Sequence, residues 1–225
     1  MSRYLVRRAS QPPRFEDDFF TGEQWKNAEV MTLENAYYKP DMKPEDCFRP
    51  SVKLKVMYDD QNIYGMYYVE DQYVTVSRTG YQQSVCRDSC VEIFLQPQDD
   101  KFHYLNFEFS GGTAMLLYNI KDLKIKDYTP VPDEDCETVI RRSTLPARVM
   151  PENPDPVTWK FFFQMPIALF VKTGYNVNPA LSGQVWRGNV TKCADDSSHP
   201  AWLSWQQLTK LNFHLPECFG EFIFE

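Results

Sequence analysis

The segment from Asp88 to Pro97 places a carboxylate inside a strictly alternating apolar pattern. The aliphatic residues Val91, Ile93 and Leu95 alternate with Glu92 and its polar or aromatic neighbours, and Pro97 ends the run. A period of two is typical of a β-strand, and it directs the aliphatic side chains to one face and Glu92 to the other. Phe94 shares the face of Glu92, so we expect that face to be partly covered. A carboxylate held there could accept hydrogen bonds from hydroxyl groups or act as an acid or base.

Two further segments repeat this arrangement of one apolar face and one hydrogen-bonding face. In residues 103–110, Asn106 and Glu108 alternate with Leu105, Phe107 and Phe109, and in residues 185–192 three polar residues share a face: Arg187, Asn189 and Thr191. If the three strands are neighbours, these side chains supply the mixed donors and acceptors that a hydroxyl-rich ligand requires. The alternative is a solvated sheet face with an Arg–Glu ion pair, which contributes little to stability.

Two other kinds of site use residues that are also present. Glu92 and Glu108 would form a glycosidase acid–base pair if their carboxyl groups were ~5 Å or ~6.5–9.5 Å apart, although no surrounding motif favours this. A haem-binding electron-transfer domain needs a Met/His or His/His axial pair over an apolar pocket. Met66, Met115 and His103 are available for such a pair, but their spacing is not diagnostic.

Composition narrows the classes of partner. The chain of 225 residues has a net charge of −7, which argues against nucleic acid because phosphate repulsion is not offset. Apolar runs are too short to span a membrane, and the N-terminus has no apolar stretch typical of a signal peptide. We therefore expect a cytoplasmic protein as the chain stands, or a secreted or periplasmic one if a leader was removed. The six cysteines include no CxxC pair, so their spacing predicts reduced thiols rather than a zinc site.

The remaining pattern consists of short strands separated by proline-rich loops. We predict strands near residues 52–58, 63–69, 90–96, 103–110, 158–165, 185–192 and 220–224, and the first two form a hairpin around Asp59–Asn62. Long amphipathic helices are missing from the pattern. The sequence therefore predicts an all-β protein, a β-sandwich of two antiparallel sheets. We expect residues 15–225 to form a single domain, preceded by a mobile N-terminal arm at 1–14.

Four segments of the chain form a recognisable set. They are Tyr58-Asp59-Asp60 with Ile63-Tyr64, Asp88-Ser89 with Val91-Glu92-Ile93-Phe94, Trp186-Arg187-Gly188-Asn189, and Ser204-Trp205 with the ending Phe213-His214-Leu215-Pro216-Glu217-Cys218-Phe219-Gly220. Together they resemble the family 9 carbohydrate-binding modules, within the wider DOMON-like superfamily. The chain is more similar still to stand-alone family 9-like proteins of polysaccharide-degrading bacteria, and the similarity extends over most of residues 15–225.

This resemblance implies a β-sandwich that binds oligo- or polysaccharide without catalysis, with no required cofactor and with calcium in some members. Sugars in the founding members lie between two tryptophans and are hydrogen-bonded by polar strand residues. Phe213 takes the place of one tryptophan, and Val85 or Cys86 takes the place of the other. The resemblance implies sugar contacts at Glu92, Asn106, Glu108, Asn189, Thr191 and Phe213. To these we add Arg187, from the alternation of its strand, and His214, and we expect one concave polar sheet face with the aromatic Phe213 at its rim.

Overall fold

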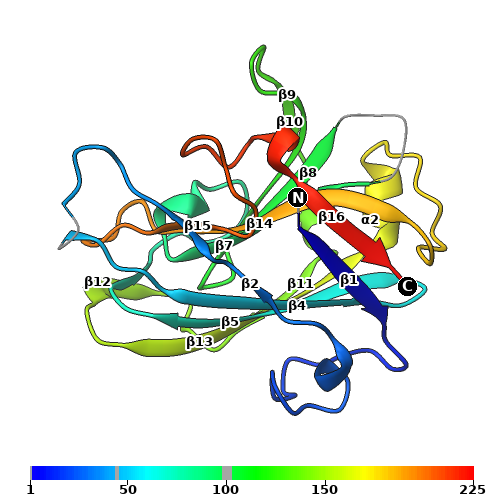
Figure 1. The fold of residues 1–225 in the computed structure, drawn as a ribbon, viewed down its shortest axis with the longest axis horizontal. Helices are drawn as coiled ribbons and strands as arrows, with labels where there is room; N and C mark the ends of the chain where they lie inside the picture. The colour runs from blue at the N-terminus through cyan, green and yellow to red at the C-terminus, as the bar shows by residue number, and fades with distance from the viewer. Residues whose placement is uncertain (1, 44–45, 98–102) are drawn as a thin grey trace.

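The computed structural model describes residues 2–43, 46–97 and 103–225, which form two β-sheets packed face to face (Figure 1). The first, sheet A, has the strand order β10-β9-β8-β7-β14-β16-β1, with β15 beside β14 and β3 beside β15. Its strands are β10 (Asp127–Pro130), β9 (Met115–Asp122), β8 (Tyr104–Ser110), β7 (Cys90–Gln96), β14 (Val185–Cys193), β16 (Gly220–Phe224), β1 (Arg3–Arg8), β15 (Trp202–Ser204) and β3 (Asn35–Tyr37).

The second, sheet B, has the order β1-β4-β5-β13-β11, with β2 beside β4. Its strands are β4 (Ser51–Tyr58), β5 (Asn62–Asp71), β13 (Val157–Pro166), β11 (Ile140–Ser143) and β2 (Met31–Thr32), and a separate pair is formed by β6 (Val74–Val76) and β12 (Val149–Asn153). Helices are few and short: α1 (Asp133–Cys136), α2 (Ile167–Lys172) and the 3-10 turns η1 (Trp25–Asn27), η3 (Val85–Arg87) and η4 (Pro216–Cys218). The predicted all-β sandwich is confirmed, and each predicted strand has its counterpart.

Strand β1 differs from the expected N-terminal arm at residues 1–14. Arg3 to Val6 pair in parallel with β16, and Arg7 and Arg8 pair in parallel with β4, so this strand belongs to both sheets. Tyr4 and Val6 are buried in the sandwich, and the Tyr4 hydroxyl accepts from the Val56 backbone at 2.8 Å. The rest of each sheet is antiparallel, so β1 provides the parallel pairings that alternation alone could not predict.

The core fills the space between the sheets, where the apolar faces predicted from alternation meet. From sheet A it includes Ile93, Phe107 and Trp186, and from sheet B it includes Tyr67 and Phe161. Phe109 stacks on Phe161 with ring centroids 5.0 Å apart. This interior is what turns the alternate residues of β7, β8 and β14 toward the outer face of sheet A.

A segment of the N-terminal region covers the outer face of sheet B. Phe19 and Trp25 are fully buried there against Met57, Met66 and other residues of the sheet. The ammonium group of the buried Lys55 donates to the Phe19 and Trp25 carbonyl oxygens at 2.9 and 2.8 Å. Because Met66 lies on this outer face and Met115 lies in the sandwich core, the two methionines of the haem alternative do not share a pocket.

Candidate functional site

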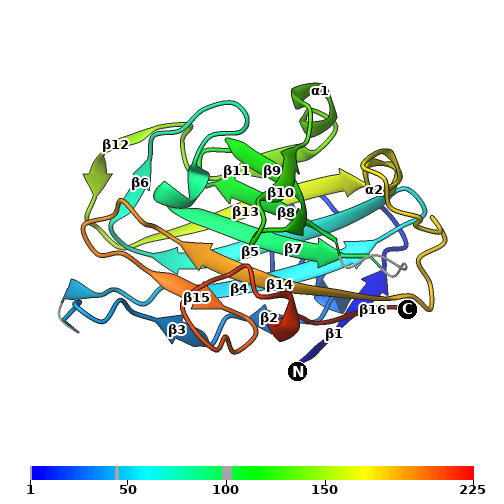
Figure 2. The ribbon, with the colours of Figure 1, turned by 90° about the horizontal axis from the view of Figure 1, so that it is seen from above.

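The outer face of sheet A brings the predicted site residues of three strands together. Figure 2 shows these strands, β8, β7 and β14, side by side. Across β14, β7 and β8, one row of the register runs from Thr191 through Glu92 to Glu108. The next row runs from Asn189 through Phe94 to Asn106. Arg187 follows on β14 beside Gln96. The strand residues predicted to share a face therefore do so, and they lie opposite the core.

Two apolar clusters cover this face. The first consists of Val85, Cys90, Ala114, Leu116, Cys193 and Trp202, and the second of Phe94, Tyr104, Ile120 and Phe219. Tyr118 and Phe213 are partly exposed and pack against both clusters. As a result, the predicted strand residues other than Arg187 are buried. The cover is more complete than Phe94 alone would suggest, and Phe213 lies against both clusters rather than at a free rim.

Several predicted residues already use their hydrogen-bonding groups within the protein. The Thr191 hydroxyl and the Cys193 thiol donate to the two carboxylate oxygens of Glu92 at 3.0 and 2.9 Å. The Asn189 amide donates to the Ser204 hydroxyl at 2.8 Å, and its oxygen accepts from the Val190 and Gln206 backbones. These residues form the fixed base of the site.

Arg187 and His214 connect the sheet to the segment that covers it. The Arg187 guanidinium donates to the carbonyl oxygens of Pro216 and Phe219 at 2.9 and 3.3 Å. His214 Nδ1 lies 3.0 Å from the Tyr104 hydroxyl, and the imidazole packs edge-on against Phe94 with centroids 5.3 Å apart. Burial lowers the pKa of His214 to about 4, so the ring is neutral at pH 7. Both residues therefore hold residues 214–219 in place, a role that sequence alternation does not indicate.

Three side chains on this face are buried with polar atoms that have no partner among the described residues. They are Gln96 (Oε1), Asn106 (both amide atoms) and Glu108 (Oε2). Buried polar groups are nearly always hydrogen-bonded in native proteins, and each one left unpaired costs about 1–3 kcal/mol. A cluster of such groups on one face indicates a place where a ligand supplies the partners. Gln96 was not predicted, although it follows Glu92 and Phe94 at the same period of two.

A groove of about 740 Å³ opens beside these residues at the Arg187 end of the face. Its lining includes Gln96, Tyr104, Arg187, His214 and Lys210. This volume is typical of small-molecule sites. The groove therefore reaches Gln96 from solvent, whereas Asn106 and Glu108 do not line it.

The two glutamates on this face have shifted pKa values. Burial raises the pKa of Glu92 to about 7, although the thiol of Cys193, the hydroxyl of Thr191 and the nearby amide of Asn106 oppose this. Burial and the neighbouring Glu92 raise the pKa of Glu108 well above its usual range. Among the described residues, neither carboxyl has an ion-pair partner.

These shifts predict that stability falls as pH rises. Since each carboxyl holds its proton more tightly in the folded state than at the unfolded value of about 4.3, its contribution is complete at low pH. That contribution is lost as pH rises through about 7 for Glu92. Urea unfolding in chelator-treated buffer between about pH 5 and pH 8 measures how the free energy of unfolding changes with pH. The pH dependence should be flatter in Glu92→Gln and Glu108→Gln, and an unchanged slope in both would contradict the assignment.

Two residues of this face gave no sequence signal of a site. Trp202 is buried, and its indole nitrogen donates to Asp195 at 2.7 Å while Lys39 lies over the ring at 4.7 Å. Cys193 lies directly opposite Cys90 across β14 and β7. Both depend on pairing between distant strands, which no local pattern reports.

Comparison with known proteins places this fold. The profile of carbohydrate-binding family 9 matches residues 26–224. A candidate carbohydrate-binding protein from Bacteroides uniformis has a similar structure, with a TM-score of 0.83, 22% identity and 99% of each chain covered.

A family 9 module from Caldicellulosiruptor kristjanssonii is also similar, with a TM-score of 0.65 and 16% identity over 100% of this chain. Its structure has been solved with glucose and with cellotriose, and the alignments to these two structures cover 96% and 94% of the module's own chain. Among proteins with curated functions, none matches the chain in sequence. In the described part of the chain, all helices are too short or too polar to cross a bilayer. The match over most of the chain, together with the shared sandwich, shows that this protein belongs to carbohydrate-binding family 9.

Proposed function

We propose that the protein binds a saccharide, without catalysis, on the outer face of sheet A around Gln96, Asn106 and Glu108. The observation that carries this proposal is the set of buried polar atoms on that face that have no partner in the described ranges of the chain. A pyranose offers several hydroxyl groups that both donate and accept, which suits an amide with two free atoms beside a carboxyl group. The family and the sugars held by the similar module support glucose or a short glucose oligosaccharide as the first ligand to test.

Aromatic rings complete the proposed site. Sugar rings pack their C–H faces on aromatic side chains, and Tyr118 and Phe213 are the partly exposed rings that touch both clusters of the cover. Tyr118 lies directly opposite Asn106 across β8 and β9. The polar atoms of Asn106 are buried, so the sugar reaches them when these rings shift aside, entering from the groove beside Gln96. This pair stands in for the two tryptophans that the family resemblance leads us to expect.

Binding fits this site better than glycoside hydrolysis does. A glycosidase needs two carboxyl groups that flank the scissile bond. Both oxygens of Glu92 instead accept hydrogen bonds from the protein, and the side chain is buried among neighbouring strands. In this proposal Glu92 therefore positions its neighbours and does not take part in catalysis. The cytoplasmic location remains a prediction from the sequence.

Replacement of Asn106 by leucine, a side chain of similar shape, tests the proposal. We expect saccharide binding to weaken at least tenfold, about 1.4 kcal/mol, because the sugar loses its amide partner. The free energy of unfolding should rise by about 1 kcal/mol at the same time, because an unpaired buried amide is removed. Calorimetric titration with glucose and cellotriose measures the first effect, and thermal unfolding, with about 2–4 °C expected for each kcal/mol, measures the second.

The exposed Asn176 provides the matched control. Asn176→Leu should leave both binding and stability unchanged within error. If the parent protein binds a saccharide that Asn106→Leu binds equally well, this site is wrong. If the parent binds no member of a broad glycan panel, the proposed function itself is wrong.

A further inference from the structure

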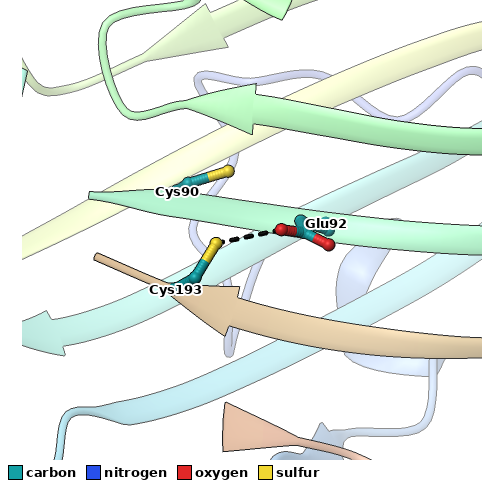
Figure 3. A group of neighbouring side chains, drawn as sticks. All are labelled: Cys90, Glu92 and Cys193. Atoms are coloured by element: carbon teal, nitrogen blue, oxygen red, sulfur yellow. Dashed lines mark hydrogen bonds between the residues drawn. The ribbon is translucent and has the colours of Figure 1, made fainter. Parts of the chain in front are cut away.

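A second set of buried side chains lies beside the proposed sugar site. Cys90, Glu92 and Cys193 come from the neighbouring strands β7 and β14 and point toward one another (Figure 3). One sulfur or oxygen atom from each lies within 4.8 Å of the others. The ligand atoms of a tetrahedral zinc site are roughly 3.3–3.8 Å apart, so small side-chain rotations would bring these three into place.

Neither glutamate near this set has an ion-pair partner in the part of the chain that the structure describes. Glu108 faces Glu92 across β7 and β8, is 7% exposed, and has one carboxylate oxygen without a partner. The nearest buried lysine in the register, Lys192, pairs with Asp71 on the core side of sheet A. Among the described residues, no ion pair is formed by either glutamate. Two carboxyl groups and two thiols are thus buried together, and Lys192, the cation of the described residues that acts on Cys90, is already paired with Asp71.

The types of donor indicate which kind of ion would fit. Thiolates are soft ligands that select zinc and similar ions, whereas calcium and magnesium are bound by six or more oxygen atoms. Thr191 donates to Oε2 of Glu92 and leaves Oε1 on the side of Cys193. A hydrogen bond of this kind holds a ligating carboxylate in one orientation. The site therefore has the features of a small, sulfur-rich metal centre.

We propose that Cys90, Cys193 and Glu92 bind a thiophilic divalent cation such as Zn²⁺ as three of its ligands. On binding, each thiol releases its proton to solvent, as does the Glu92 carboxyl where it is protonated, and the thiolate sulfurs and the carboxylate form bonds to the metal. The Cys193 hydrogen bond to Glu92 is then replaced by two metal–ligand bonds. The cation links β7 to β14 beside the sugar site, but this inference does not depend on saccharide binding.

Metal titration of the reduced, chelator-stripped protein tests the proposal. Zn²⁺ competed against a chromophoric chelator should bind at one ion per chain. Co²⁺ used in its place should give the near-ultraviolet charge-transfer band of a cobalt–thiolate bond. Cys90→Ser and Cys193→Ser should remove this band and weaken binding at least tenfold, and Glu92→Gln should weaken binding while it keeps the band.

Two cysteines outside the set are the matched controls. Cys47 and Cys218 are partly exposed and free, and their serine variants should bind metal as the parent does. If a serine variant at Cys90 or Cys193 fails to fold, then Glu92→Gln and a zinc-dependent rise in the melting temperature of the parent decide the matter. The proposal is overturned if the reduced parent binds no stoichiometric ion, or if the cobalt band survives in both serine variants. It is also overturned if the reduced protein binds no metal and, on exposure to air, forms a disulfide between Cys90 and Cys193.

Discussion

Replacement of Asp88 by alanine is expected to lower the free energy of unfolding by about 3–5 kcal/mol. The Asp88 carboxylate is fully buried and forms an ion pair with Arg78 at 3.0 Å. It also accepts from the backbone and hydroxyl of Ser77, the backbone of Arg78 and the hydroxyl of Ser110, at 2.8–3.1 Å. Alanine would leave these donors without a partner and would release the loop that precedes β7. Urea unfolding at pH 7 measures the loss.

The same carboxylate predicts the response to acid. Burial raises the pKa of Asp88, but hydrogen bonds from Arg78, Ser110 and Ser77 outweigh it and hold the pKa below its usual range. Its stabilising effect is therefore present above the unfolded value of about 3.9 and is lost as pH falls through the lower folded value. Asp88→Asn should lose part of this acid dependence. The exposed Asp155 is the control, and Asp155→Ala should change stability by less than about 0.5 kcal/mol. An equal effect at both positions would show that the Asp88 network is not structural.

Replacement of Lys192 by methionine should also destabilise the fold by about 3–5 kcal/mol. Lys192 is 0% exposed inside the sandwich, and its ammonium group lies 3.3 Å from the buried carboxylate of Asp71. The Trp159 indole nitrogen donates to the same carboxylate at 3.1 Å. Methionine fills the space of the lysine but leaves Asp71 as a buried charge with no cation. Denaturant unfolding of the single variant measures this penalty.

A double variant separates the charge from the packing. Lys192→Met combined with Asp71→Asn should recover most of the lost stability, because asparagine still accepts from Trp159 and carries no charge. The exposed pair of Lys26 and Glu23 is the matched control, and Lys26→Met should cost less than about 1 kcal/mol. If the double variant is no more stable than Lys192→Met, then the cavity rather than the charge explains the loss.

The strands were predictable because the alternation of apolar and polar residues within each strand identifies the side chains that face the core. Alternation in β7, β8 and β14 assigned Glu92, Asn106 and Asn189 to one face, and the register agrees. The burial of that face was not predictable, because its cover comes from distant segments such as the one that carries Phe213. A strand pattern reveals which residues share a face but does not reveal what lies above it.

Two other features depend on pairings that span about half of the chain. Cys90 and Cys193 have no CxxC spacing, yet they are direct neighbours in the register of β7 and β14. Lys192 alternates with Thr191 and so falls on the core side, but its partner Asp71 belongs to the other sheet. Spacing rules for metal ligands and ion pairs describe local segments, which is why neither feature was predicted.

Strand β1 protects an edge of each sheet at once. Arg3 to Val6 cover the edge of β16, more than 200 residues away in the chain, and Arg7 and Arg8 cover β4. A chain shortened by residues 1–9 would present both edges as unpaired rows of backbone donors and acceptors, which recruit strands from other molecules. A short strand held by so few neighbours can also be exchanged between two copies, giving a swapped dimer in which each protein completes the sheets of the other.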